Sequence, residues 1–237
     1  MAIYTSKTRI DLEDVGYSNK ITNKAILKIL ENAGARQSET IHFGLNDMEN
    51  VGFSWILLGW KVKILKRPIY NEELTINTWG RDSNRIFTYR DYEIYDESGE
   101  LCAIATSKWA IVDINTGKLR ELTPEIIEKY QCETKKVFEE DYTLKLKEPV
   151  TIIRKQEYKA QRRDIDINKH IHNLYYLDYA YEVLPEEVYE APECNNIEIM
   201  YKKQIRLNDE FKCLYTKEEN QNIVTMKSED ENTLHAI

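Results

Sequence analysis

The chain has 237 residues, and its 41 acidic side chains outnumber its 33 basic ones, so the formal net charge is −8. This balance argues against a nucleic-acid partner, because proteins that bind nucleic acid usually present a net basic face. No window holds the roughly 18 uninterrupted apolar residues of a membrane-spanning helix, and the first residues lack the basic flank and apolar run of a signal peptide. We therefore expect a cytoplasmic protein that does not contact a membrane.

A helix over residues 21–33 is the first regular element that the sequence predicts. Apolar side chains recur on one face at helical spacing, at Ile21, Ala25, Ile26, Ile29, Leu30 and Ala33. Thr22 or Asn23 is the expected N-cap, because a short polar side chain can accept a hydrogen bond from the first free amides of a helix. We expect this helix to be buried along the apolar face.

Four strands are predicted next, over residues 54–66, 74–80, 85–95 and 101–114. Each is rich in β-branched and aromatic residues, and turn-forming residues such as Asp96-Glu97-Ser98-Gly99 separate them. The first half of the chain is thus expected to be one long helix followed by an antiparallel meander.

The same order of elements returns after a polar segment, residues 131–147, which we interpret as a linker. The second half is predicted to contain a strand, a helix that Pro185 ends or kinks, and three more strands, at residues 151–160, 174–184, 195–206, 210–217 and 221–228. Asp14-Val15-Gly16 precedes the first helix much as Asp166-Ile167-Asn168 precedes the second, about 150 residues later. We infer an α+β fold of two repeats, residues 1–130 and 148–237.

Polar side chains of three kinds alternate in the segment before the second helix. A carboxylate, an amide and an imidazole stand at Asp166, Asn168 and His170. In an extended backbone such positions point to the same side, so we expect the three side chains to face one pocket. The isoleucines of this segment should face the core: Ile165, Ile167 and Ile171.

These side chains suit the hydrolysis of a thioester. A carboxylate or an imidazole can take a proton from water, and an amide can orient that water or donate to the carbonyl oxygen. The N-terminus of the following helix would add free N–H groups where negative charge develops. Such a site needs no metal or organic cofactor, and we expect none. The same residues also suit turn and N-cap hydrogen bonds, and their spacing does not decide between the two roles.

Other chemistry-bearing motifs are absent from the sequence. It has no GxGxxG, P-loop or GxSxG motif, and His42 and His172 have no carboxylate or cysteine at metal-ligand spacing. The cysteines form no Cys-x-x-Cys pair, so we expect free thiols in a reducing compartment. Cys194 and Cys213 are expected to be buried, and His235 to lie in a frayed terminal segment.

The segment from Asp164 to Glu182 resembles the signature of plant and bacterial acyl-ACP (acyl carrier protein) thioesterases. It carries Asp166-Ile167-Asn168-Lys169-His170, then Asn173, Tyr176 and Glu182, and the later run Ile197–Lys203 is similar as well. The resemblance extends over nearly the whole chain and implies a double (tandem) hotdog fold, in which each antiparallel sheet wraps a long helix. It also implies a catalytic C-terminal domain and an N-terminal domain that selects the acyl chain, without a histidine near Asp14.

One position departs from the family pattern. The family has a catalytic glutamate followed by a cysteine, 34 residues after the histidine, where this chain has Gln204 and Ile205. Ile205 excludes a cysteine nucleophile at that position. Gln204 keeps the hydrogen-bonding reach of glutamate but cannot accept a proton.

The expected reaction is hydrolysis of fatty acyl-ACP to free fatty acid and holo-ACP. We hypothesise that Asp166 and His170 activate the water, while Asn168 positions the water or the carbonyl group. Gln204 would hold this network together. Two alternatives stay open: an acyl-CoA thioesterase, and a hotdog protein that binds acyl carriers without cleaving them. Assembly into a homodimer also stays open.

Surface and core residues outside this segment carry weaker expectations. Basic clusters occur at Lys61–Arg67, at Arg162 and Arg163, and at Lys202–Arg206; each is either a solvated face or a docking point for the acidic carrier. The tryptophans are mostly expected in the core, and a few of them to line an acyl tunnel between the first helix and its sheet.

Overall fold

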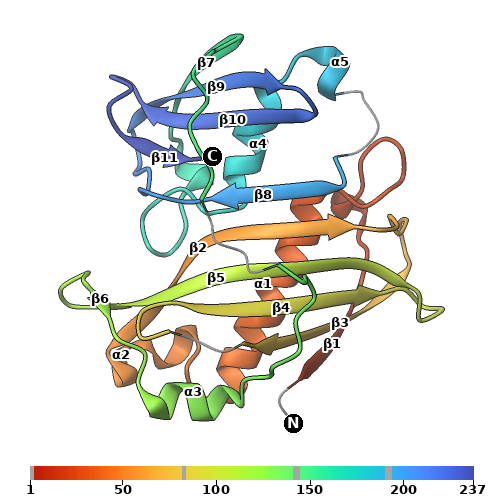
Figure 1. Ribbon diagram of the computed structural model, residues 1–237, viewed down its shortest axis with the longest axis vertical. Coiled ribbons are helices and arrows are strands. Elements are labelled where there is room, and N and C mark those ends of the chain that lie inside the picture. The colour runs from red at the N-terminus through yellow and green to blue at the C-terminus, as the bar shows by residue number, and fades with distance from the viewer. Residues whose placement is uncertain (1–2, 82–83, 141–144, 190–193) are drawn as a thin grey trace. The chain divides into compact units, whose positions relative to one another are not determined.

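The computed structural model describes residues 3–81, 84–140, 145–189 and 194–237 (Figure 1). The chain forms two compact units. Unit 1 comprises Met1–Thr143 and Cys194–Glu198, and unit 2 comprises Leu144–Glu193 and Ile199–Ile237. None of the helices in the described ranges is long and apolar enough to cross a membrane.

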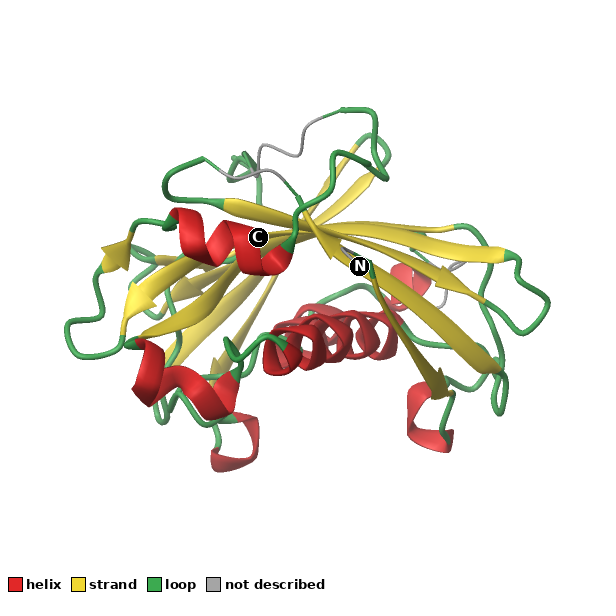
Figure 2. Ribbon diagram, turned by 90° about the horizontal axis from the view of Figure 1, so that it is seen from below, coloured by secondary structure: helices red, strands yellow, loops and turns green. Residues whose placement is uncertain are grey.

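Unit 1 is an antiparallel sheet with a long helix along one face (Figures 1 and 2). Its helices are α1 (Asn23–Thr40), α2 (Met48–Val51) and α3 (Pro124–Tyr130). Its strands are β1 (Tyr4–Arg9), β2 (Phe53–Ile64), β3 (Glu73–Gly80), β4 (Thr88–Tyr95), β5 (Leu101–Asp113), β6 (Leu119–Arg120) and the first residues of β8 (Asn196–Met200). The strand order is β1-β3-β4-β5-β2-β8, and β6 pairs with β5.

Helix α1 confirms the predicted apolar stripe and extends beyond the predicted end. Thr22 is the N-cap, and its hydroxyl accepts a hydrogen bond from the Ala25 amide at 3.1 Å. Gly34 does not end the helix. A Cβ at this position would lie 3.0 Å from the Tyr92 hydroxyl, so the glycine allows close packing of α1 against the sheet.

Apolar side chains on the inner face of the sheet meet the first half of α1. Leu27 is fully buried against this face, where the register pairs Ile76 with Ile94 and Ile94 with Ala103. Burying one such aliphatic side chain stabilises the fold by about 1.5–3 kcal/mol. The alternation of buried and accessible positions along β3 follows from the two-residue period of a strand.

The predicted meander is correct for β3, β4 and β5 but wrong for β2. Strand β2 pairs with β5, and β3 pairs with β1 instead. The connection between β2 and β3 is tied to the loop before α1, because the Ile21 amide donates to the Pro68 carbonyl at 2.9 Å. The sequence analysis missed β1, because its residues Tyr4–Arg9 are polar and contain no aliphatic side chain.

Unit 2 repeats this plan with a smaller sheet. Its strands are β7 (Arg154–Lys159), β9 (Glu210–Glu218), β10 (Gln221–Ser228) and β11 (Leu234–Ala236), in the order β11-β10-β9-β7. Its helices are α4 (Tyr175–Glu182) and α5 (Glu186–Tyr189), and Pro185 separates them as predicted. The core under the sheet consists chiefly of Tyr176, Val183, Ile205, Phe211, Cys213, Tyr215 and Met226.

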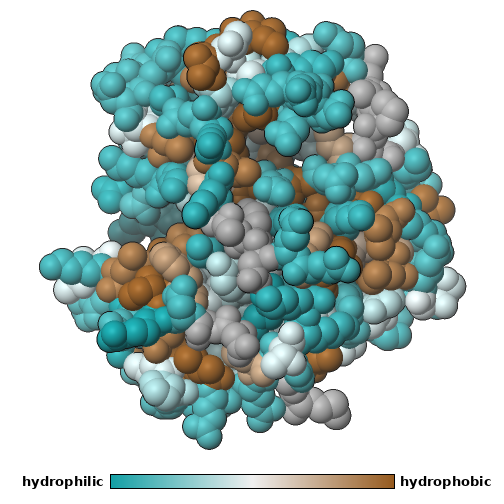
Figure 3. Space-filling view, viewed as in Figure 1, coloured by the Kyte–Doolittle hydropathy of each residue, from teal (hydrophilic) through white to brown (hydrophobic). Residues whose placement is uncertain are grey.

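The segment before β7 covers part of the other face of this sheet. The Thr216 hydroxyl donates to the Thr151 carbonyl at 2.5 Å, and the Ile153 amide donates to the Tyr215 carbonyl at 2.8 Å. Leu214 is therefore buried although it points away from the helix side of the sheet. The visible face in Figure 3 is mostly hydrophilic, with apolar side chains in separate patches.

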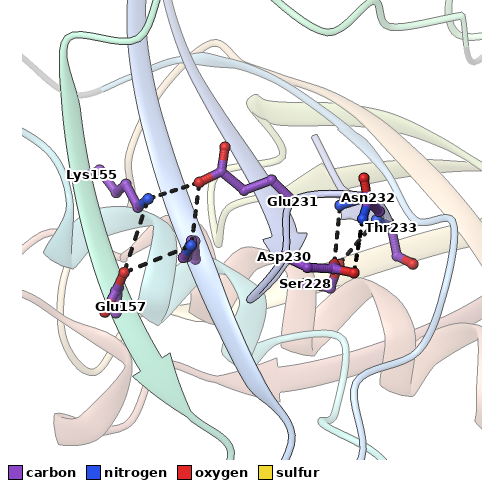
Figure 4. Close-up of polar contacts among 8 residues, drawn as sticks. Lys155, Glu157, Ser228, Asp230, Glu231, Asn232 and Thr233 are labelled. Atoms are coloured by element: carbon purple, nitrogen blue, oxygen red, sulfur yellow. Dashed lines mark hydrogen bonds and ion pairs between the residues drawn. The ribbon is translucent and has the colours of Figure 1, made fainter.

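A charged network connects β7 and β9 to the turn between β10 and β11 (Figure 4). Glu231 accepts from Lys155 at 2.7 Å and from Lys212 at 3.3 Å. In the same turn the Asp230 carboxylate accepts from the Ser228 hydroxyl at 2.5 Å and from the Asn232 amide, and these bonds lower the pKa of Asp230 to about 2. Exposed ion pairs contribute at most about 1 kcal/mol each, so the main effect of the network is to define the turn.

Candidate active site

The loop that carries the alternating polar residues is a closed turn. The Asp166 amide donates to the His170 carbonyl at 2.9 Å, and the Lys169 amide donates to the Asp166 carbonyl at 3.0 Å. Lys169 has a φ of 66°, the left-handed conformation that such a turn requires. The predicted extended backbone is therefore wrong, because these local hydrogen bonds fold the segment back on itself. Ile165 and Ile171 pair across the turn, whereas Ile167 is 65% exposed and does not face the core.

The turn nevertheless brings the predicted side chains together around the Asp166 carboxylate. Asp166 Oδ1 accepts from the Asn168 amide at 2.8 Å and from the His170 amide at 3.4 Å. The Asn168 side-chain nitrogen lies 3.4 Å from Asp166 Oδ2, and His170 Nδ1 lies 3.7 Å from Asp166 Oδ1. Asp166 and His170 expose 13% and 21% of their side chains, so both are shielded from bulk solvent but remain accessible.

Gln204 lies beside this turn because the following residues pair with it. The Ile171 amide donates to the Ile205 carbonyl at 2.8 Å, and Arg206 forms a backbone bridge with His170. Ile205 is fully buried in the core of unit 2 and contributes no reactive group. The Gln204 side chain is exposed, and none of the hydrogen bonds among the described residues involves its amide.

Basic residues surround the turn. Six of them are exposed and lie on the turn or on the segments next to it, at Arg162, Arg163, Lys169, Lys202, Lys203 and Arg206. Asp164, by contrast, is buried: its carboxylate accepts from the Tyr179 hydroxyl at 2.5 Å and from the Gln161 amide at 2.9 Å. The accessible charge next to the site is therefore mainly positive.

The start of α4 offers fewer free donors than expected. His172 Nδ1 accepts from the Leu174 amide at 3.2 Å, and the His172 carbonyl accepts from the Tyr175 amide at 2.9 Å. His172 thus binds two of the amides at the start of α4, although Leu174 is the residue directly before the helix. Within the described residues, no cluster of three or more histidine, cysteine or acidic side chains is placed to hold a metal ion.

The loop before α1 in unit 1 has the same backbone design. The Gly16 amide donates to the Lys20 carbonyl at 3.1 Å, the Asn19 amide donates to the Gly16 carbonyl at 2.9 Å, and Asn19 has a φ of 59°. These bonds match those of the Asp166 turn residue by residue, with Gly16 at the position of Asp166. The correspondence predicted between Asp14 and Asp166 is therefore wrong by two positions, because Asp14 has the place of Asp164.

The unit 1 loop lacks the carboxylate and the imidazole at the matching positions. Ser18 stands at the position of Asn168 and Lys20 at the position of His170. Arg67 stands at the position of Gln204, and its guanidinium donates to the Asn23 side chain at 2.6 Å. The carboxylate and the imidazole thus occur only in the unit 2 copy of this loop.

Comparison with known proteins identifies the family. Residues 1–130 match the acyl-ACP thioesterase N-terminal domain, and residues 147–235 match the acyl-ACP thioesterase C-terminal domain. The chain belongs to the acyl-ACP thioesterase family. Among curated relatives, oleoyl-acyl carrier protein thioesterase 1 of Arabidopsis thaliana is 24% identical over 229 residues, covering 90% of this chain and 63% of the relative. The chain thus spans less than two thirds of that relative's length.

Solved structures of acyl-ACP thioesterases share the fold. An acyl-ACP thioesterase from Bacteroides thetaiotaomicron superposes with a TM-score of 0.86 at 22% identity, covering 99% of this chain and 95% of that one. The 12:0-ACP thioesterase from Umbellularia californica gives a TM-score of 0.87 at 17% identity, covering 100% and 96%. The predicted tandem hotdog fold is confirmed. In this acyl-ACP thioesterase family member the helix of unit 2, α4, is shorter than the helix of unit 1, α1.

Three residues were not assigned correctly from the sequence. Tyr179 had no signal beyond helical spacing, yet its hydroxyl binds the buried Asp164 carboxylate. His235 is 6% exposed within β11 and is not frayed. Cys194 was expected to be buried but is exposed, because it lies outside the strands, just before β8.

Proposed function

We propose that the chain hydrolyses the thioester of fatty acyl-ACP, with the reaction taking place at the Asp166 turn of unit 2. The observation that carries the proposal is the pairing of the Asp166 carboxylate with the His170 imidazole, at 3.7 Å, in a loop whose unit 1 copy has neither group. Family membership and the names of the relatives support the substrate class. The products are a free fatty acid and the thiol of the carrier.

The contacts of His170 assign its two ring nitrogens. Nδ1 faces two acceptors, Asp166 Oδ1 at 3.7 Å and the Ile171 carbonyl at 3.3 Å, so it carries the proton. Nε2 is then free to take a proton from water. The water oxygen attacks the thioester carbonyl, the C–S bond breaks, and His170 returns the proton to the sulfur. Asp166 stabilises the imidazolium between these two steps.

Asn168 and Gln204 are assigned supporting roles. The Asn168 side chain is held by its contact with Asp166, at 3.4 Å, in a position to orient the water or the carbonyl oxygen. Gln204 directly precedes the residues that pair with His170 and Ile171, which supports a role for its side-chain amide in binding the same water. Neither amide accepts a proton, so the role of base is assigned to the Asp166–His170 pair, with the free Nε2 of His170 taking the proton.

The experiment measures thiol release from acyl-ACP by the wild-type chain, His170→Ala and Asp166→Ala. We expect both variants to lose at least about 100-fold in kcat. Lys20→Ala is the matched control, because Lys20 has the position of His170 in the unit 1 loop. Equal loss in Lys20→Ala, or full activity in His170→Ala, would contradict the assignment.

A second candidate function follows from Gln204, which replaces the acidic residue of the family pattern. A protein with an amide at this position can hold an acyl carrier without cleaving it. Tight binding of acyl-ACP by the wild-type chain with no thiol release would favour this function. Release from acyl-CoA at the same rate as from acyl-ACP would favour an acyl-CoA thioesterase.

Docking of the carrier is proposed at the basic residues around the turn. Acyl carrier proteins are acidic, and the exposed basic residues next to the site are Arg162, Arg163, Lys169, Lys202, Lys203 and Arg206. We expect KM for acyl-ACP to rise with salt, because ionic screening shortens the range of this attraction. Arg162→Gln should raise KM for acyl-ACP and leave that for acyl-CoA nearly unchanged.

Selection of the acyl chain is proposed in unit 1. Residues 131–147 are proposed as the linker between the domains, and residues 141–144 of this segment lie outside the described residues. Buried polar side chains also lie between α1 and the sheet. Arg90 is 8% exposed, and its guanidinium donates to the Gln37 side chain of α1 and to the Thr78 hydroxyl. An acyl chain that extends to the buried Arg90 guanidinium offers it no hydrogen-bond acceptor, and this contact is unfavourable. Arg90→Met should therefore shift activity toward longer chains, whereas Arg36→Met, on the exposed face of α1, should not.

We also propose a cytoplasmic location. The cysteines in the described part of the chain are all free thiols, as in a reducing compartment. Fractionation of the native host would test this point.

A further inference from the structure

The last strand of unit 2, β11, is fixed at both ends. The turn of Ser228–Thr233 precedes it, closed by the Ser228 amide donating to the Thr233 carbonyl at 2.9 Å and held by the Glu231 ion pairs (Figure 4). After the strand, Ile237 and Met200 exchange two backbone hydrogen bonds, of 2.8 and 3.0 Å. The side chains of this short strand therefore have defined positions.

His235 lies in the middle of β11 with its ring in the interior. Only 6% of the residue is exposed, and Nδ1 lies 2.8 Å from the Lys203 carbonyl oxygen. A carbonyl oxygen only accepts, so Nδ1 carries the proton and donates. The His235 carbonyl in turn accepts from the Lys202 amide at 2.8 Å. Side chain and main chain of His235 together hold Lys202 and Lys203.

Gln204 follows directly and is held from its other side as well. Ile205 is fully buried, and its carbonyl accepts from the Ile171 amide at 2.8 Å. The backbone on which Gln204 stands is thus fixed between His235 on one side and the Asp166 turn on the other. Since the Gln204 side chain makes no hydrogen bond within the described part of the chain, its position depends on these backbone anchors.

We propose that His235 is a positioning residue that acts through Lys203 to hold Gln204 beside the Asp166–His170 pair. This inference rests on the proposed function for the catalytic role of that pair. Misplacement of a supporting group by about 1 Å can cost on the order of 100-fold in rate. The buried His235 ring, bound to the carbonyl of Lys203 directly before Gln204, prevents such displacement.

The test is a double-mutant cycle between positions 235 and 204. His235→Leu removes the donor, whereas His235→Asn keeps a donor near the position of Nδ1. We expect kcat to fall about tenfold or more in His235→Leu and to recover largely in His235→Asn. In a Gln204→Ala background, which is itself slower, His235→Leu should cause little further loss.

Several outcomes would overturn the inference. An equal fall in kcat from His235→Leu in the wild-type and Gln204→Ala backgrounds would mean that His235 does not act through Gln204. Full activity of Gln204→Ala would mean that Gln204 has no role that requires positioning. Thr216→Val, which removes the buried hydroxyl that donates from β9 of the same sheet to the Thr151 carbonyl, is the control for general destabilisation; a matching loss of kcat in this variant would also count against the inference.

A second measurement keeps the proposed function and the inference separate. Amide hydrogen exchange at residues 202–205 should accelerate in His235→Leu and remain slow in His235→Asn, whether or not the wild-type chain releases thiol. Absence of release with this exchange pattern would refute the hydrolytic function but retain the anchor. Unchanged exchange in His235→Leu would refute the anchor itself.

Discussion

Replacing Asp166 by asparagine tests whether the carboxylate stabilises the charged form of His170. Asparagine keeps an oxygen that can accept from the Asn168 and His170 amides, which Asp166 Oδ1 does at 2.8 and 3.4 Å. The shape of the turn should therefore survive, and only the negative charge is lost.

The expected loss follows from the distance and the exposure of the pair. Two unit charges about 4 Å apart attract by about 1 kcal/mol in water and about 4 kcal/mol near a protein surface. His170 Nδ1 and Asp166 Oδ1 are 3.7 Å apart, and their side chains are 21% and 13% exposed, so the pair lies between these limits. A barrier higher by about 1–4 kcal/mol lowers kcat roughly 5- to 900-fold.

The assay is steady-state thiol release from acyl-ACP at pH 7, with thermal unfolding measured in parallel. Asp166→Ala, which also removes the bonds to the two amides, should be at least as slow as Asp166→Asn and less stable. A kcat of Asp166→Asn within twofold of wild type would refute the role of the charge. A large loss accompanied by a large fall in Tm would refute the claim that the turn survives.

Three further predictions concern single positions. Gln204→Glu should leave kcat unchanged or lower it, because the Asp166–His170 pair is proposed to act as the base, and a large gain would contradict that assignment; circular dichroism should remain the same. Cys194, which is exposed, should react with a thiol reagent in the native state. Cys102 should not, because burial raises its pKa to about 11, and equal labelling of the two would contradict the fold. Burial lowers the pKa of His235 below its ordinary value of 6.5. The stabilising contribution of neutral His235 is therefore present above that value and is lost as the pH falls below it, so chemical denaturation should show a steeper loss of stability below pH 6.5 in wild type than in His235→Asn.

The sequence by itself determined the elements whose patterns are local. The apolar stripe of α1, its Thr22 cap and the aromatic and β-branched runs of β3 to β5 are read from neighbouring residues, because helix and strand periodicities depend on spacing alone. Pro185 likewise ends α4 by a local steric effect. The polar strand β1 has no such pattern. Its backbone pairing with β3 holds it in the sheet, and this pairing cannot be read from its own side chains.

The candidate site was predicted in its membership but not in its geometry. Asp166, Asn168 and His170 do gather, yet they do so through a turn whose hydrogen bonds and left-handed Lys169 depend on backbone conformation. An i, i+2, i+4 spacing is equally compatible with a strand and with such a turn, so the spacing did not distinguish them. The resemblance placed Gln204 in the site, and the pairing of Ile205 with Ile171 brings it beside the turn.

Only the tertiary structure decided which distant residues support the site. His235 is 32 residues from Lys203 in the sequence, and its ring reaches the Lys203 carbonyl only because β11 is placed by the turn before it. The pairing of β2 with β5 in the sheet of unit 1 likewise joins residues far apart in the sequence. Such contacts follow from loop closure and packing over long separations, which the periodicity of a segment does not encode.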